Sequence, residues 1–393
     1  MPYDFDRIIN RRNTNSLKWN AYPEDVLPLW VADMDFAAPQ PIIRALQEAV
    51  EHGIFGYDIP GKTLRETVAA RMNTLYGWQV APESVVSITG LVSGFYAAAQ
   101  TLCRPGEGYL IQPPVYMPFN HLQKDLGIIR QEAKLNKAAQ DGILRYQIDW
   151  DSFEQAFHSG GSRTKMFLLC NPHNPTGQIY SAEELSRMAE TCLKQDTVIV
   201  SDEIHSELIL GESKHVPIAS LSPEIAQKTI TLIAPSKTFN IAGLFCGFAI
   251  IPNKELRERY KEQVERMTLH VNGLGYVAAR AAFSGACDDW LMELRAYLKA
   301  NRDFLVKFVQ SELTGICTTH PEATYLAWLD CRQQTESGKI SGSPYEFFLK
   351  KARVALNDGA TFGTGGQNFV RLNFGCPRAT LEQALERMKK ALA

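Results

Sequence analysis

The order of apolar and polar positions along the chain predicts an alternation of strands and helices. Short runs rich in β-branched residues predict strands, and spacing of apolar residues by three and four predicts helices between them. This alternation is typical of an α/β fold whose mainly parallel sheet is covered by helices on both faces. The predicted strands are residues 84–89, 109–112, 166–170, 197–201, 229–233 and 246–251, the last with a possible antiparallel direction, and the predicted helices are 41–52, 64–76, 91–102 and 183–195, the last of them N-capped by Ser181.

The C-terminal third has a different pattern. Three helical stretches come first, and the longest carries a continuous apolar stripe of the kind that often bridges two domains. An α+β tail follows, and its last helix is predicted to open with a capping box of Thr380 and Gln383. We therefore expect a large domain from residues 37–284 and a small domain from residues 1–36 and 285–393. The predicted elements of this part are helices 255–268, 275–284, 289–313 and 344–353 and strands 325–329 and 368–374.

Composition narrows the function classes. The chain has 393 residues, 45% of them hydrophobic and 21% charged, with a formal net charge of -2. This profile is that of a globular protein, and neither a basic stripe for nucleic acid nor an apolar run for a membrane span is present. The N-terminus lacks a signal-peptide pattern, and the eight cysteines are scattered without a Cys-x-x-Cys or a zinc spacing. We expect a cytoplasmic protein with reduced thiols and no metal site.

The strand predicted at residues 229–233 is followed by Pro235, Ser236 and Lys237. Proline does not continue a central strand, so Lys237 follows the carboxyl end of a buried strand, where open α/β sheets hold ligands. Partial desolvation there would lower the pKa of the amine and prepare it to form a Schiff base. The plain alternative is a solvated surface lysine, and the other strand ends decide between the two.

Three more strand ends carry groups suited to one ligand. Gly90, Leu91 and Val92 follow the strand at 84–89 and open a helix, so their backbone N–H groups form a cradle for an anion. Tyr116 follows the strand at 109–112 and offers an aromatic face. Asn174 lies between two Asn-Pro steps that restrict the loop, and its amide could donate to an oxyanion. Each of these residues could also be no more than part of a turn.

Asp202 follows the apolar run 197–201 directly. A carboxylate there is costly to bury unless it meets a cation or a donor, although capping of a helix is an alternative. His205 lies three residues later and would share a face with Asp202 on a starting helix. A phosphate cradle, an aromatic plate, an amide donor, a buried carboxylate and an amine nucleophile together fit pyridoxal 5′-phosphate (PLP).

Three sequence motifs strengthen this interpretation. The runs 171–177 (Asn-Pro-His-Asn-Pro-Thr-Gly), 201–205 (Ser-Asp-Glu-Ile-His) and 236–240 (Ser-Lys-Thr-Phe-Asn) resemble those of the class I/II aminotransferases, PLP enzymes of fold type I. With the runs 11–19 and 30–36, the chain is most similar to the cystathionine β-lyase-like C–S lyases. The resemblance extends from the N-terminal segment to Arg371, and it implies a seven-stranded-type large-domain sheet.

The resemblance implies a role for each candidate residue. Lys237 would be the Schiff-base lysine and proton carrier, Asp202 would pair with the pyridinium nitrogen, and Asn174 would bind the ring hydroxyl oxygen. His205 stands where many relatives have a tyrosine. Tyr116 would stack on the ring, and the phosphate would lie near Gly90, Leu91, Val92 and the Ser236 hydroxyl. Arg371 would bind the substrate α-carboxylate, and Tyr57 would reach the phosphate of the neighbouring subunit. A shared site of this kind implies a homodimer.

Two positions depart from the family pattern. Many relatives have a phosphate-binding arginine eight residues after the lysine, where this chain has Phe245, and often a serine three residues before it, where this chain has Ala234. Another cation or donor must compensate for both, and the sequence does not identify it.

The branch resemblance favours β-elimination from cystathionine-like or cysteine S-conjugate amino acids, giving pyruvate, ammonia and a thiol. Transamination between an L-amino acid and a 2-oxo acid is the alternative, and the residues alone leave both open. A non-catalytic regulator with the same fold would not need Lys237 and Asp202 intact. A dinucleotide-dependent oxidoreductase is less compatible, because no Gly-x-Gly-x-x-Gly follows the first strand. The natural substrate, any regulatory role and assembly beyond a dimer cannot be read from the sequence.

Overall fold

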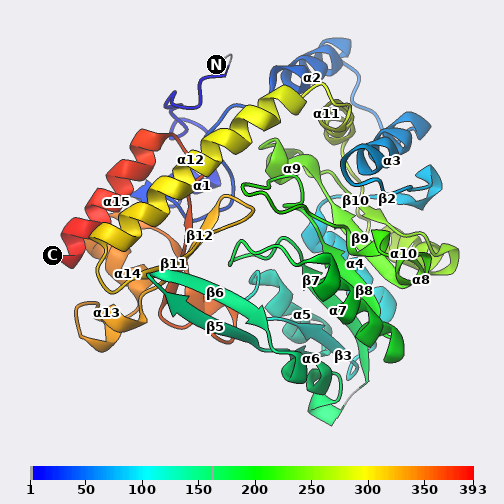
Figure 1. The fold of residues 1–393 in the computed structure, drawn as a ribbon. Helices are drawn as coiled ribbons and strands as arrows, with labels where there is room; N and C mark the ends of the chain where they lie inside the picture. The colour runs from blue at the N-terminus through cyan, green and yellow to red at the C-terminus, as the bar shows by residue number, and fades with distance from the viewer. Residues whose placement is uncertain (1–2, 162) are drawn as a thin grey trace.

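The fold is built on a central seven-stranded sheet, seen in a computed structural model that describes residues 3–161 and 163–393 (Figure 1). Its strand order is β2-β10-β9-β8-β7-β3-β4, and every pairing is parallel except those of β10, which runs antiparallel to both neighbours. The strands are β2 (Val85–Ile88), β3 (Gly108–Ile111), β4 (Ile129–Glu132), β7 (Thr164–Cys170), β8 (Val198–Asp202), β9 (Thr229–Ile233) and β10 (Gly247–Ile250). The predicted fold class is confirmed, including the antiparallel strand.

Burial explains why these runs are strands without alternation. All residues of β3, β9 and β10 are buried, because helices cover both faces of the sheet. Phe95 of α4 and Tyr260 of α10 pack in one layer, and Leu185 of α7 and Phe153 of α6 pack in the other. Ser181 caps α7 as predicted, and together with Glu184 it forms a capping box. These helices are α4 (Leu91–Leu102), α5 (Pro118–Leu126), α6 (Trp150–Ala156), α7 (Ala182–Lys194), α8 (Pro223–Gln227) and α10 (Lys254–Arg266).

A second sheet of six strands collects segments from the middle and the end of the chain. Its order is β14-β15-β12-β11-β6-β5, and β6 pairs in parallel with β11. The hairpin of β5 and β6 leaves the edge of the first sheet, because only Ala133 and Lys134 separate β4 from β5. The strands are β5 (Leu135–Gln140), β6 (Ile143–Ile148), β11 (Cys317–Thr319), β12 (Leu326–Asp330), β14 (Asn357–Asp358) and β15 (Phe369–Asn373), and β1 (Leu27–Pro28) pairs separately with β13 (Val354–Ala355).

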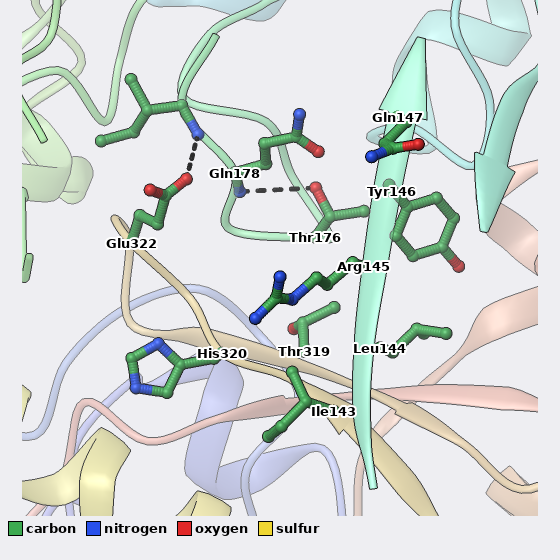
Figure 2. Close-up of a pocket in the computed structure, with 11 residues that line it drawn as sticks. Ile143, Leu144, Arg145, Tyr146, Gln147, Thr176, Gln178, Thr319, His320 and Glu322 are labelled. Carbon is green, nitrogen blue, oxygen red and sulfur yellow. Dashed lines mark hydrogen bonds between the residues drawn. The ribbon is translucent and has the colours of Figure 1, made fainter. Parts of the chain in front are cut away.

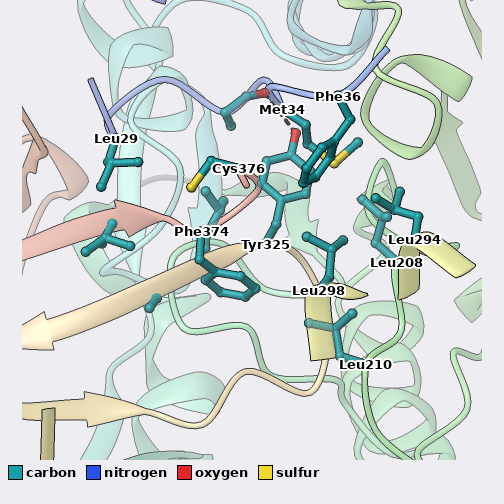
Figure 3. Packing of buried hydrophobic residues seen from close by; sticks show 14 of the residues in the cluster. Leu29, Met34, Phe36, Leu208, Leu210, Leu294, Leu298, Tyr325, Phe374 and Cys376 are labelled. Atoms are coloured by element: carbon teal, nitrogen blue, oxygen red, sulfur yellow. Dashed lines mark hydrogen bonds between the residues drawn. The ribbon is translucent and has the colours of Figure 1, made fainter. Parts of the chain in front are cut away.

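Helix α12 (Asp288–Glu312) runs along one side of the molecule, beside α15 (Arg378–Leu392) (Figure 1). Leu294 and Leu298 of α12 pack into a core that also holds Met34, Phe36 and Tyr325, so the N-terminal segment is buried against the C-terminal part (Figure 3). The predicted long helix is confirmed. The other helices are α1 (Leu17–Asn20), α2 (Gln40–His52), α3 (Lys62–Tyr76), α9 (Pro235–Thr238), α11 (Gly273–Phe283), α13 (Arg332–Glu336) and α14 (Pro344–Phe347); the short 3₁₀ turns are η1 (Pro82–Ser84), η2 (Ser159–Gly161), η3 (Ile218–Ser220), η4 (Ala242–Leu244) and η6 (Gly359–Phe362).

One prediction about the C-terminal elements is confirmed and another is wrong. The helix expected at 344–353 is present as α14 followed by a π-helix, η5 (Phe348–Ala352), and it stops at Arg353 with φ 56°. The capping box expected from Thr380 does not form, because α15 already begins at Arg378 after Pro377, without a side-chain cap. A proline just before the first turn replaces the hydroxyl cap in starting this helix.

The loop after β7 touches the C-terminal part through backbone. Gly177 has φ +73°, and a Cβ atom built on it would lie 2.5 Å from the Cβ of Pro321. The Gly177 carbonyl accepts hydrogen bonds from the N–H groups of Glu322 and Ala323 at 2.9 and 3.0 Å. Both the backbone conformation and the close approach therefore require glycine here. Across residues 3–161 and 163–393, no helix is long and apolar enough to cross a membrane.

Candidate active site

A cavity of about 570 Å³ lies where five parallel strands of the first sheet end. It brings together residues that are up to 341 positions apart in the chain, between Trp30 and Arg371. Ten of the eleven residues predicted to form the site line it: Gly90, Leu91, Val92, Tyr116, Asn174, Asp202, His205, Ser236, Lys237 and Arg371. The strand-end argument accounts for these groups at one location except for Arg371, which the resemblance alone supplied.

Lys237 lies on the one-turn helix α9, just beyond β9. Its side chain is partly buried, and its Nζ donates to the Ala32 carbonyl at 2.7 Å. Burial lowers the pKa of the ammonium to about 8, and the nearby Arg371 guanidinium lowers it further in the same direction. A substantial fraction of Lys237 is thus a free amine near neutral pH, as a nucleophile or a proton acceptor requires.

Asp202 is the last residue of β8 and is buried beside Cys170, its register partner on β7. Its Oδ1 accepts from the Ile204 N–H at 3.2 Å, a turn contact rather than a helix cap. Burial raises the pKa of this carboxyl to about 7, although the Ile204 N–H and Lys237 act in the opposite direction. A buried acid that forms no ion pair within the described residues suits a cationic partner on a ligand.

Asn174 connects the loop after β7 with the C-terminal sheet. Its N–H donates to Cys170 Sγ at 3.4 Å, and its Oδ1 accepts from Arg371 Nη1 at 3.1 Å. Because the oxygen is occupied by Arg371, the NH₂ group remains to donate to a ligand oxygen, as predicted.

His205 lies in a turn after β8, so the expectation that it shares a helix face with Asp202 is wrong. Residues 204–207 form turns, in which the Ser206 N–H donates to the Glu203 carbonyl and the Leu208 N–H to the His205 carbonyl. His205 is buried, its Nδ1 has no hydrogen-bond partner among the described residues, and burial lowers its pKa to about 3. The neutral ring thus presents an unsatisfied nitrogen beside the cavity. Burial also raises the pKa of Tyr116, whose ring lines the cavity and meets Phe119 edge to face.

The anion end of the cavity lies at the start of α4. The first-turn N–H groups of Leu91, Val92 and Ser93 have no intrahelical acceptor, and a Cβ on Gly90 would meet nothing within 4 Å. The Phe245 side chain, 63% exposed, lines the cavity, and its backbone has φ 47°. Among the described lining residues the cations are Lys237 and Arg371, so this chain brings no arginine to the cradle. What compensates for Phe245 and Ala234 is still not identified.

Arg371 extends from the middle of β15 and is buried. Its guanidinium lies over the Phe362 ring, 5.1 Å from the centroid, and donates to the Trp30 carbonyl at 3.0 Å and to the Asn357 side chain. Its Nε has no partner among the described residues, and burial lowers its pKa to about 10. The stacking on Phe362 and three fixed contacts orient a cation with unused donors, a geometry suited to a carboxylate.

Sequence reasoning missed several residues of this site. Trp30, Val31 and Ala32 form one wall of the cavity, and Asn357 contacts Arg371 directly. The run 30–36 carries part of the family resemblance. Its contacts with Lys237 and Arg371 are made by backbone carbonyls, which residue types do not reveal.

Tyr57 does not line the cavity of its own chain. It is fully exposed and stands among other exposed apolar side chains: Ile54, Phe55 and Ile59. Its contact with the phosphate of a neighbouring subunit therefore stays a prediction.

A second cavity, of about 520 Å³, lies between β6, the loop containing Thr176, and the segment from Thr319 to Glu322 (Figure 2). Its basic residues are Arg145, which is exposed, and His320, which faces Asp303 at 3.6 Å. It contains none of the predicted site residues, so the first cavity is the candidate active site. Nowhere in the described ranges do three His, Cys, Asp or Glu side chains gather as a metal site would need.

The first cavity fits PLP by its own chemistry. An amine of lowered pKa, a buried acid, an orphaned histidine nitrogen, an amide NH₂ and free helix N–H groups match the aldehyde, ring nitrogen, ring hydroxyl and phosphate of this cofactor. These groups are Lys237, Asp202, His205, Asn174 and the start of α4.

Comparisons with known proteins agree with this chemistry. A model of the family "Aminotransferase class I and II" matches residues 24–388. A cystathionine β-lyase of Bacillus subtilis, PatB, is 41% identical, with 99% of this chain and 100% of that protein covered. The structure of cystalysin from Treponema denticola, which contains a pyridoxal 5′-phosphate cofactor, has a TM-score of 0.92 at 32% identity, covering 100% of this chain and 99% of the other. A PLP-bound C–S lyase from Staphylococcus hominis has a TM-score of 0.91 at 31% identity, covering 100% and 98%.

Proposed function

The chain belongs to the class I and II aminotransferase family, and we propose that within it the protein is a PLP-dependent carbon–sulfur β-lyase. The proposed substrates are cystathionine-like or cysteine S-conjugate amino acids. With one water, each yields a thiol, pyruvate and ammonia. The observation that carries the proposal is the 41% identity, over 99% of the chain, to a protein named cystathionine β-lyase.

When bound, PLP would supply an electron sink that accepts the electron pair left at the substrate Cα. Lys237 would hold the cofactor and, once released, take the Cα proton on its Nζ. The pKa of about 8 makes Nζ a base of suitable strength near neutral pH. The substrate then loses its β-substituent: the Cβ–S bond breaks, the sulfur leaves with the electron pair, and a proton completes the thiol.

The other residues would bind and orient. Asp202 would keep a proton on the ring nitrogen by ion pairing, and Asn174 and His205 would contact the ring oxygen. Arg371, oriented by Phe362, would hold the substrate α-carboxylate. Fixed orientation of the Cα–H bond toward Nζ is the part of the catalysis that this chain's geometry supplies.

Transamination of an L-amino acid with a 2-oxo acid is the alternative activity of the same site. Dicarboxylate substrates are disfavoured, because Lys237 and Arg371 are the basic lining residues in the described part of the chain and neither is free for a distal carboxylate. The choice between elimination and transamination, in which the proton returns to the cofactor, then depends on where Lys237 Nζ is held.

We further propose a homodimer in which Tyr57 reaches the partner's phosphate site. The exposed apolar group Ile54, Phe55, Tyr57 and Ile59 is the surface such an interface would cover. The proposed domains are residues 37–284 and residues 1–36 with 285–393. A cytoplasmic location is proposed from the eight free cysteines.

The deciding experiment is pyruvate release from cystathionine with and without a 2-oxo-acid acceptor. Release without acceptor supports the lyase, and product that forms only with acceptor supports the transaminase. The purified protein should also be yellow, and Lys237→Ala should remove the visible absorbance. A wild-type protein that stays colourless after reconstitution with PLP would refute both activities.

A further inference from the structure

The backbone of residues 30–33 holds both cations of the candidate active site. The Trp30 carbonyl accepts from Arg371 Nη2 at 3.0 Å, and the Ala32 carbonyl accepts from Lys237 Nζ at 2.7 Å. The two acceptors are two residues apart in a bend of the chain, in which the Asp33 N–H donates to the Val31 carbonyl at 2.9 Å. One short segment therefore determines where the carboxylate clamp and the amine lie.

The carbonyl between the two acceptors, that of Val31, and the next one along, that of Asp33, are held by Asn373 instead. Asn373 Nδ2 donates to the carbonyls of Val31 and Asp33, both at 2.7 Å, and the Asn373 N–H donates to the Leu29 carbonyl at 2.9 Å. Asn373 Oδ1 is itself held by the Gly375 N–H at 2.8 Å. Both the Nδ2 and the Oδ1 of Asn373 are thus hydrogen-bonded, and this side chain fixes the segment.

Tyr325 acts on the cavity side of the same segment. Its hydroxyl donates to the Ala32 carbonyl at 2.9 Å, so this oxygen receives both Tyr325 and Lys237. Tyr325 is 1% exposed and packs beside Met34 and Phe36 (Figure 3). Because a carbonyl oxygen has two acceptor sites, the hydroxyl occupies one and leaves the other for the amine.

We propose that Tyr325 is a positioning residue for Lys237: its hydroxyl orients the Ala32 carbonyl, which in turn sets where the free Lys237 amine lies. Sharing the acceptor also limits how strongly the carbonyl stabilises the charged ammonium, since hydrogen bonding to the charged form favours that form. The relevance to turnover rests on the proposed function, in which Nζ carries the Cα proton. The contact itself does not depend on that function.

Tyr325→Phe tests the proposal, because it removes the hydroxyl and keeps the ring. Tyr109→Phe is the matched control: Tyr109 is also buried and donates to a backbone carbonyl, that of Phe119 at 3.0 Å, away from the cavity. The first readout is the rate of trace acetylation of Lys237 by acetic anhydride in the cofactor-free protein, followed against pH by mass spectrometry. We expect the pH at which the acetylation rate is half-maximal to rise in Tyr325→Phe only. In that variant Lys237 alone uses the Ala32 oxygen, so its charged form is stabilised more strongly.

The second readout is turnover of the PLP-loaded enzyme with a cysteine S-conjugate. In Tyr325→Phe we expect kcat to fall about fivefold, the loss expected for one hydrogen bond, with KM unchanged and the acid limb of kcat moved upward. Tyr325→His, which retains a donor, should restore part of the wild-type acetylation profile, and it also serves if Tyr325→Phe does not fold.

The proposal would be overturned if the acetylation profile of Tyr325→Phe superimposed on that of the wild type. It would also be overturned if the acetylation profile of Tyr325→His showed no return toward that of the wild type. Failure of the proposed function would give a different result: the midpoint of the acetylation profile would still move in Tyr325→Phe, but neither the wild type nor any variant would form pyruvate.

Discussion

His205 and Tyr325 pack edge to face, with ring centroids 6.0 Å apart and planes at 81°. The tyrosine ring belongs to the segment before β12, and the histidine follows β8, so the contact joins the two sheets at the candidate active site. It holds the imidazole in place without using its Nδ1, which has no partner in the described part of the chain. The free nitrogen is thus reserved for a ligand.

His205→Ala should weaken cofactor retention. The variant loses the buried nitrogen expected to contact the cofactor, so we expect faster loss of visible absorbance on dialysis and about tenfold lower kcat. Since burial lowers the His205 pKa to about 3, the effect should be constant from pH 6 to 9. The exposed His121→Ala is the control; equal retention by both variants would contradict the assignment.

The elimination rate should rise with pH through about 8. Burial lowers the Lys237 pKa from 10.5 to about 8, and the amine must be unprotonated to accept the Cα proton, so the active form accumulates as pH rises through that value. The measurement is kcat at saturating substrate from pH 6 to 10. A rate that falls across this range would show that Lys237 is not the proton acceptor.

Asp202→Asn should stabilise the cofactor-free protein and impair the loaded enzyme. The folded-state pKa of Asp202 is raised from 3.8 to about 7, so between these values the folded state binds the proton more tightly and stability is lost as pH rises. At pH 8 we expect the variant to gain roughly 2–4 kcal/mol in the free energy of unfolding by urea. The same variant with PLP should lose most of its turnover. Equal stability of the two proteins at pH 8 would argue against a buried, unpaired acid.

Arg371→Lys should raise KM much more than it lowers kcat. Lysine cannot reproduce the fork or the stacking on Phe362, and loss of about 2 kcal/mol in carboxylate binding corresponds to roughly thirtyfold in KM. Arg332→Lys is the control, because Arg332 also lies over an aromatic ring, that of Phe369, and pairs with Asp330 outside the cavity. An unchanged KM in Arg371→Lys would place the carboxylate elsewhere.

Gly177→Ala should destabilise the protein by roughly 2–3 kcal/mol, since the new Cβ meets Pro321 and the residue has φ +73°. Gly338→Ala separates the two causes: Gly338 has φ +78° but open space around it, so only the backbone effect, about 1 kcal/mol, remains. Urea unfolding compares them. Equal destabilisation of both variants would mean that the loop yields to the added methyl.

The sequence predicted the parts of the site that side-chain chemistry reveals. Lys237, Asp202 and Asn174 each follow a buried apolar run, and parallel strands bring such ends to one edge of a sheet. Arg371 was placed by resemblance, because it comes from the middle of β15 rather than from a strand end. Its partner Asn357 lies in a two-residue strand with no pattern to predict it.

The hairpin of β5 and β6 was also missed. Five of the six residues of β5 are exposed, so its run Leu-Asn-Lys-Ala-Ala-Gln has no buried face to produce alternation. Local signals were nevertheless present: β6 alternates between buried and exposed residues, and Asp141 and Gly142, with φ 52° and 76°, form the two-residue turn between the strands. The pairing of β6 with β11, in contrast, joins strands distant in sequence, and local periodicity does not encode it. The wall at residues 30–33 is similar, because its contacts are made by carbonyl oxygens common to every residue.

The two-residue connection of Ala133 and Lys134 has a mechanical consequence. Because β4 and β5 are edge strands of different sheets, this short connection limits how far the two sheet edges can separate. We expect glycines inserted between Ala133 and Lys134 to relax that limit.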